Sequence, residues 1–224
     1  MSPSPSSVVN KALRRHLSPA LRQAGFERVD ARNGWSWQTE QCIWVFTVRA
    51  VGSYFASSTG WPAASLTAWL GVLYAFIPQR SPLRRDPTGR LLPAEHECHM
   101  RSHLELTHSQ LERTSVLKNP AERTRRDIWW VAPDHSNVDE VAASITQAFQ
   151  ASLPWFRRCS NFEAALADVA AEHDCFNKYV LGAYLARTVG DRPLAEKFRL
   201  LAEREGARIH ILPDPGRWYS VGGR

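Results

Sequence analysis

Apolar residues recur at helical spacing near the start of the chain. They lie three or four residues apart and so share one face of a helix that we predict over residues 8–24. That face holds Val9, Leu13, Leu17, Leu21 and Ala24. Ser18 and Pro19 interrupt the pattern, and serine as N-cap with proline at the first helical position predicts that the helix restarts there.

After residue 34 the pattern changes to alternation with a period of two, which is typical of strands. Trp35 and Trp37 alternate with polar residues, which predicts a first strand. Residues 43–49 are apolar on both faces until Arg49, so we expect a central strand there. Residues 64–76 form a third predicted strand, and the Ser- and Gly-rich residues 52–62 before it are interpreted as a loop.

The second half of the sheet region is less clear in pattern. Residues 80–93 form an Arg-, Pro- and Gly-rich loop. Residues 95–106 fit either a strand or a weak helical stripe, and the cleaner alternation favours the strand. Residues 128–131 form a short apolar strand, and Pro154 is expected to end a helix over residues 138–153.

The rest of the chain is helical in pattern, with candidates over residues 162–173, 176–189 and 194–205. Strands in series followed by helices predict an α+β fold with a mostly antiparallel sheet of four to five strands, flanked by helices. We expect a disordered lead-in over residues 1–7, an α+β domain over 8–160, a helical extension over 161–213 and a tail over 214–224.

Short segments in a fixed order resemble an uncharacterised bacterial family catalogued as a domain of unknown function (series number 4304). They are Gly25-Phe26, Trp35-Ser36-Trp37, Leu70-Gly71-Val72, Cys98-His99-Met100-Arg101, Trp129-Trp130 and Leu153-Pro154-Trp155-Phe156. The resemblance covers roughly residues 10–165. The resemblance supports the predicted fold, and it implies no particular activity.

The helical extension also resembles a tetratricopeptide helix pair. The matching residues are Leu181-Gly182, Ala195, Phe198 and Ala202. The spacing from Leu181 to Ala195 departs from that repeat by one residue, and a single copy cannot bury its own apolar face. Two helices that pack on the preceding domain are the simpler interpretation.

Composition limits where the protein acts. The sequence has no apolar run long enough to span a membrane and no signal-peptide layout at its start. Its cysteines, Cys42, Cys98, Cys159 and Cys175, form no close pair, which favours free thiols in a reducing cytoplasm. We therefore expect a cytoplasmic bacterial protein without a membrane partner and without a cofactor.

The densest cluster of chemically able groups lies at residues 95–103. His99 and His103 would share one face of a helix and could hold a metal ion, whereas on a strand they would lie about 13 Å apart. Phosphate loops, dinucleotide-binding glycines and a nucleophile elbow are absent from the sequence. We predict no catalytic residue, and His99 and His103 remain weak metal candidates.

The formal net charge of +6 permits binding to an anion without requiring it. The best anion-contact candidates lie in the arginine-rich loop, and they are Arg80, Arg84, Arg85 and Arg90. A solvated loop is the alternative, because prolines and acidic residues stand beside these arginines.

Trp61 and Trp218 lie in loop-like contexts and are candidate contacts for a partner, although a loop tryptophan can equally pack on its own domain. The first hypothesis is a non-enzymatic module with an accessory, immunity or regulatory role, which binds a protein through its sheet surface and these loops. Alternatives are a nucleic-acid or phosphate binder that uses the arginine loop, and a metal-assisted hydrolase. The oligomeric state stays open.

Overall fold

The computed structural model describes residues 5–79 and 82–208. It divides into two compact units. The sheet unit comprises Met1–Leu73 and Leu92–Pro154, and the helical unit comprises Tyr74–Leu91 and Trp155–Arg224. Each unit is described by itself below. No helix among the described residues is long and apolar enough to cross a membrane.

A five-stranded antiparallel sheet forms the centre of the sheet unit, with strands in the order β1-β2-β3-β4-β5. The strands are β1 (Arg28–Val29), β2 (Asn33–Thr39), β3 (Cys42–Ala50), β4 (Leu66–Tyr74) and β5 (Met100–His103). Neighbouring strands are therefore also consecutive in the chain, as the run of strands in series predicts. The α+β class with a mostly antiparallel sheet and C-terminal helices is confirmed.

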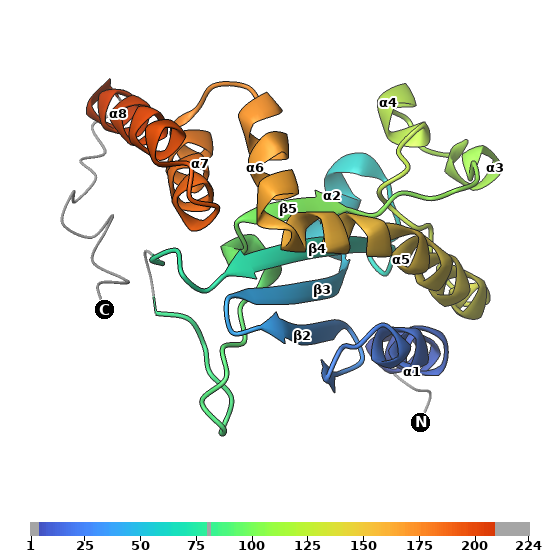
Figure 1. The fold of residues 1–224 in the computed structure, drawn as a ribbon. Helices are drawn as coiled ribbons and strands as arrows, with labels where there is room; N and C mark the ends of the chain where they lie inside the picture. Colours follow the sequence, from blue (N-terminus) through green and yellow to red (C-terminus); the bar gives the residue numbers. More distant parts are fainter. Residues whose placement is uncertain (1–4, 80–81, 209–224) are drawn as a thin grey trace. The chain divides into compact units, whose positions relative to one another are not determined.

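One face of the sheet is covered by α1 (Pro5–Gln23) and α5 (Val138–Ser160) (Figure 1). Phe149 of α5 is fully buried and meets Phe46 of β3 and Phe26 edge-on, at ring-centroid distances of 5.2 and 5.7 Å. Gly34 of β2 leaves the room that Phe26 fills, because a Cβ there would lie 2.7 Å from the Phe26 ring. This helix-covered face is the main apolar core of the unit.

Two predicted helix breaks are wrong, because α1 passes through Pro19 and α5 passes through Pro154. Proline removes one backbone hydrogen bond from a helix. The burial of apolar side chains before and after the proline stabilises the helix by more than this loss. In α1, Leu17 and Leu21 flank the proline and are at most 1% exposed. Helix α1 also begins at Pro5, within the expected lead-in, and proline suits the first position of a helix.

A further correction concerns the predicted loop over residues 52–62, where the structure has helix α2 (Gly52–Thr59). Gly60 ends α2 with a φ of 87°, a left-handed conformation that favours glycine. Phe55 of α2 packs against a buried cluster that includes Trp61 and Ile128, and this tertiary contact outweighs the weak helical propensity of the segment. The predicted strand near residue 128 is reduced to a single bridge between Trp129 and Leu66.

The ambiguous segment over residues 95–106 contains both kinds of structure. A short 3-10 turn, η1 (Glu95–Glu97), precedes β5, so the strand prediction is confirmed for Met100–His103 and wrong for the residues on either side. The Glu97 carboxylate accepts a hydrogen bond from the Ala94 backbone N–H at 2.6 Å and closes the turn. Two short helices follow, α3 (Leu111–Thr114) and α4 (Pro120–Arg123).

The helical unit contains α6 (Phe162–Ala171), α7 (Phe176–Thr188) and α8 (Arg192–Arg208). Helices α7 and α8 pack together closely, because Gly182 of α7 lacks the Cβ that would lie 2.8 Å from the Phe198 ring of α8. Phe162 of α6 packs edge-on against Tyr74 and Phe76 of the same unit. Three helices are therefore present where the apolar pattern predicts them.

Candidate functional site

The second face of the sheet is half covered and half open. The register places Trp35 opposite Val45, and Gly71 opposite Arg101, so each pair lies on a common face. Residues 92–98, called here the covering segment, lie over one half of that face. The Trp35 indole N–H donates a hydrogen bond of 2.8 Å to the Pro93 carbonyl. A Cβ on Gly71 would lie 2.5 Å from the Cys98 sulfur, so only glycine admits the segment this closely.

The other half of this face borders the segment, whose residues Glu95 and His96 reach two arginines there, and is otherwise not covered by it. Alternation along β3, β4 and β5 brings the side chains of Arg49, Thr67, Trp69, Arg101 and His103 to it. We call this set the open half. It combines two guanidinium groups, an imidazole, a hydroxyl and an indole. These groups are attached to three neighbouring strands, and a paired sheet holds them in fixed positions.

A buried carboxylate organises the two arginines of the open half. The Glu95 side chain is fully buried beneath them, while the Arg49 and Arg101 side chains are 46% and 44% exposed. The Arg101 Nε–H donates to Glu95 Oε1 at 2.6 Å, and the Arg49 Nη2 lies 3.3 Å from Oε2. Glu95 therefore anchors one guanidinium by a hydrogen bond and draws the second toward it by charge.

An aromatic pair lies beside these charges. The Trp69 ring meets His103 at a centroid distance of 5.8 Å with an interplanar angle of 63°. The Trp69 indole N–H donates a hydrogen bond of 3.1 Å to the Thr67 hydroxyl. Trp69 is half-buried and His103 exposed, so the rings present an edge of apolar surface next to the arginines.

The border of the open half near His103 carries negative charge. The His103 Nε2 lies 3.5 Å from the Glu105 carboxylate. The Asp127 carboxylate accepts hydrogen bonds from Arg125, which lowers the Asp127 pKa below its usual range. The Arg125 guanidinium also lies 5.5 Å from the centre of the Phe55 ring. Asp127 and Arg125 balance each other's charge, so Glu105 supplies the negative charge next to His103.

Burial changes the pKa of two chemically reactive groups beside the open half. Burial raises the pKa of the Cys98 thiol well above its usual value, and the neighbouring Glu95 carboxylate adds to the rise, so the group is a poor nucleophile. Burial lowers the pKa of His99 to about 4, which keeps its imidazole neutral at physiological pH. Among residues 5–79 and 82–208, no group of three or more His, Cys, Asp or Glu side chains is placed to hold a metal ion.

The metal candidate His99 lies directly before β5, and His103 is the last residue of β5. His99 is partly buried and its backbone N–H donates to the Val72 carbonyl at 3.0 Å, while the exposed His103 packs on Trp69. The extended backbone between the two histidines keeps their rings apart, as predicted for the case in which this segment is a strand.

The predicted anion-contact arginines belong to the helical unit. Arg84, Arg85 and Arg90 are exposed on a turn that Asp86 organises by accepting hydrogen bonds from the backbone N–H groups of Thr88 and Arg90. The Arg85 guanidinium donates to the Gly89 carbonyl at 2.6 Å. Arg80 lies outside the described residues. An anion-binding role of this turn stays a prediction.

The predicted partner contact Trp61 is 1% exposed. Its ring packs against Trp130 at 5.6 Å between centroids, and its indole N–H donates to the Glu122 carboxylate at 2.8 Å. The structure therefore corresponds to the alternative in which a loop tryptophan packs on its own domain. The apolar ring is buried there, and its single polar atom has a hydrogen-bond acceptor. Trp218 lies outside the described residues.

The residues that organise the open half were not among the predicted site residues. Arg49 is noted in the sequence only as the point where an apolar strand becomes polar, and Glu95 and Arg101 only as members of the histidine cluster. A usable signal is present at Arg49, a charged position at the end of an otherwise apolar strand, whereas Arg101 lies in a polar segment and gives no such signal.

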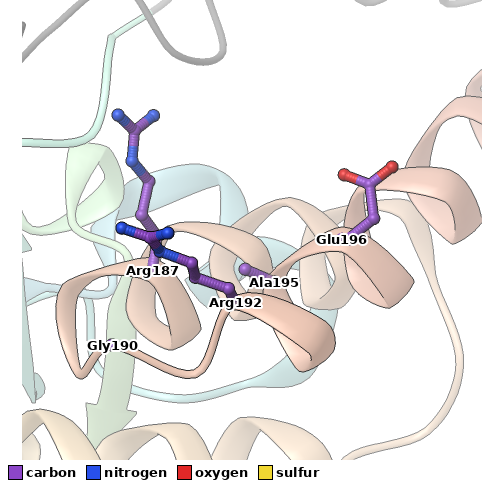
Figure 2. Close-up of a pocket in the computed structure, with 5 residues that line it drawn as sticks. All are labelled: Arg187, Gly190, Arg192, Ala195 and Glu196. Atoms are coloured by element: carbon purple, nitrogen blue, oxygen red, sulfur yellow. The ribbon is translucent and has the colours of Figure 1, made fainter.

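A concavity lies in the helical unit, at the turn between α7 and α8. It has a volume of about 540 Å³ and is lined by Arg187, Gly190, Arg192, Ala195 and Glu196 (Figure 2). Figure 2 shows the two arginine side chains extending on the same side of the turn. Both are exposed, so the pocket is a weaker candidate than the open half, whose arginines lie over the buried Glu95.

The fold and the open half define an α+β protein with a sheet surface suited to binding. The chain belongs to the family described as "Domain of unknown function (DUF4304)", whose model matches residues 17–158. This confirms the resemblance to the unknown-function family. No curated protein and no solved structure matches the chain.

Proposed function

We propose that this protein is a non-enzymatic binding module of the bacterial cytoplasm that recognises a protein partner through the open half of its sheet. The single observation that carries the proposal is the pair of half-exposed arginines over the buried Glu95, next to Trp69. Arginine and tryptophan are the residue types that most often dominate protein interfaces. Their attachment to three paired strands keeps the ordering cost of binding low.

Two further observations support the cellular setting. Cys42, Cys98, Cys159 and Cys175 are all free thiols, and three of them are buried. Free thiols of this kind are typical of a reducing compartment. An accessory, immunity or regulatory role fits a chain that offers a recognition surface and no arranged catalytic group among its described residues.

Site-specific photo-crosslinking in the native host tests the proposal. A benzoylphenylalanine in place of the exposed His103 places the reactive group in the open half, and the same residue in place of the exposed Thr88 is the matched control. We expect protein adducts from position 103 that are lost when Trp69→Ala is added, and none of these adducts from position 88. Equal adducts from both positions, or nucleic-acid adducts from position 103, would contradict a protein-binding role of the open half.

A further inference from the structure

The hydrogen-bond donors of the two arginines are only partly used. A guanidinium group carries five N–H donors in a fixed fork. The Arg101 Nε and Nη2 atoms both contact Glu95 Oε1 at 2.6 Å, which leaves the outer side of the group to solvent. Arg49 Nη2 contacts Glu95 at 3.3 Å and the His96 ring nitrogen at 3.5 Å. Both side chains therefore keep donors at a surface where they are nearly half exposed.

Glu95 holds the two groups near each other without fully satisfying them. Its Oε2 atom is buried and has no hydrogen-bond partner among the described residues, although Arg49 lies within ion-pair distance. Arg49 is therefore drawn toward the carboxylate by charge and is not fixed by a hydrogen bond to it. Such a group can turn its fork toward a ligand at small cost, while Arg101 stays anchored.

The local charge selects a ligand with a single negative charge. Two guanidinium groups above one buried carboxylate leave a net charge of one positive unit. A side-chain carboxylate balances that charge, whereas a doubly charged phosphate would leave one unbalanced negative charge above the buried Glu95. Glu105 borders the same surface beyond His103 and disfavours a long chain of negative charges such as nucleic acid, while the nearby Asp127 charge is balanced by Arg125.

We infer that the open half binds an acidic segment of its protein partner, in which an aspartate or glutamate carboxylate sits between Arg49 and Arg101 and an adjoining apolar side chain packs on Trp69. Arg49 and Arg101 contact the ligand, and Glu95 is a positioning residue beneath them. The inference rests on the proposed function, to which it adds the chemistry of the partner.

Binding of fluorescently labelled polymers to the full chain tests this chemistry. The probes are a short poly-L-glutamate, a neutral glycine–serine peptide of equal length and an oligothymidylate. We expect poly-L-glutamate to bind at least about tenfold more tightly than the other two, and to weaken as salt is raised. Equal affinity for the neutral peptide, or tighter binding of the oligothymidylate, would overturn the inference.

Single variants locate the binding site. Arg49→Gln and Arg101→Gln should each reduce the affinity for poly-L-glutamate about tenfold, because each removes charged hydrogen bonds. Arg49→Lys keeps the charge without the fork and should lose less. The matched control is Arg14→Gln, which removes an exposed arginine of helix α1 and should leave the affinity unchanged. A loss with Arg14→Gln equal to that of Arg49→Gln would contradict the assigned site.

The two proposals can fail separately. If crosslinks from position 103 to a protein persist at full yield in Arg49→Gln, the open half binds a protein without the carboxylate contact, and only the present inference fails. If poly-L-glutamate binding depends on Arg49 while position 103 crosslinks no protein in the host, the anion site is real and the protein-binding function fails. Unchanged thermal unfolding of Arg49→Gln ensures that a lost signal reports on binding.

Discussion

Trp69 and Gly71 lie two residues apart on β4 and on the same face of the sheet, yet their surroundings are opposite. At Gly71 the covering segment approaches so closely that a Cβ would lie 2.5 Å from the Cys98 sulfur. At Trp69 the face is open, and the indole lies beside an exposed histidine and two half-exposed arginines. Strand alternation determines which residues share a face, and the packing of a distant segment determines which of them reach solvent.

The largest expected difference between the two halves is in the pH dependence of stability. Burial holds the pKa of His99 at about 4, compared with 6.5 for a free histidine. As the pH falls below about 6.5, His99 becomes protonated in the unfolded chain but stays neutral in the folded chain. The free energy of unfolding is therefore highest above pH 6.5 and decreases until about pH 4, where the folded chain also binds the proton. The shift corresponds to a loss of about 3 kcal/mol, measurable by urea unfolding at several pH values.

Two histidine variants make the test specific. His99→Gln should flatten the pH dependence, because it removes the group that resists protonation. His103→Gln replaces an exposed histidine of the open half and is the matched control, in which the pH dependence caused by the burial of His99 should persist. If both variants flatten the curve equally, the two histidines do not differ as the structure indicates.

The next largest effect is expected at Gly71. Gly71→Ala should destabilise the protein by about 1–3 kcal/mol, because the new methyl group overlaps the Cys98 side chain in a closely packed layer. Adding Cys98→Ala should recover part of the loss by removing the sulfur. Thr67→Ala, on the same strand in the open half, should cost at most about 1 kcal/mol, which is the typical contribution of the hydrogen bond it accepts from the Trp69 indole. Equal costs at Gly71 and Thr67 would show that the covering segment is not closely packed.

The sequence predicts the strands of the sheet well because they are encoded locally. Alternation identifies β2, β3 and β4 and places Arg49 at the polar end of a central strand. Helix α2 and the passage of α5 through Pro154 were missed, since both depend on distant apolar partners. The same limit applies to the site: nothing in the local pattern shows that Glu95 is buried, because two arginines from other parts of the chain make that burial possible.

A smaller effect on stability is expected from removing the buried charge. Glu95→Gln should destabilise the protein by about 1–2 kcal/mol, a value reduced because solvent screens the half-exposed arginines. A double-mutant cycle with Arg101→Gln measures how much of this loss belongs to the pair. We expect the two single variants to be coupled, because the double variant removes both charges. Strict additivity would mean that Glu95 does not hold Arg101 in solution.

The smallest effect concerns the exposure of Trp69. Trp69→Phe should change the unfolding free energy by less than about 1 kcal/mol, because the ring is only half-buried and phenylalanine keeps the contact with His103. It should nevertheless reduce the part of the tryptophan emission that iodide quenches, since Arg49 and Arg101 attract the anion to this indole. Trp61→Phe is the matched control: Trp61 is 1% exposed, so its loss should reduce stability and leave iodide quenching unchanged. If iodide quenching decreased in Trp61→Phe and not in Trp69→Phe, the assignment of Trp61 as covered and Trp69 as open would be wrong.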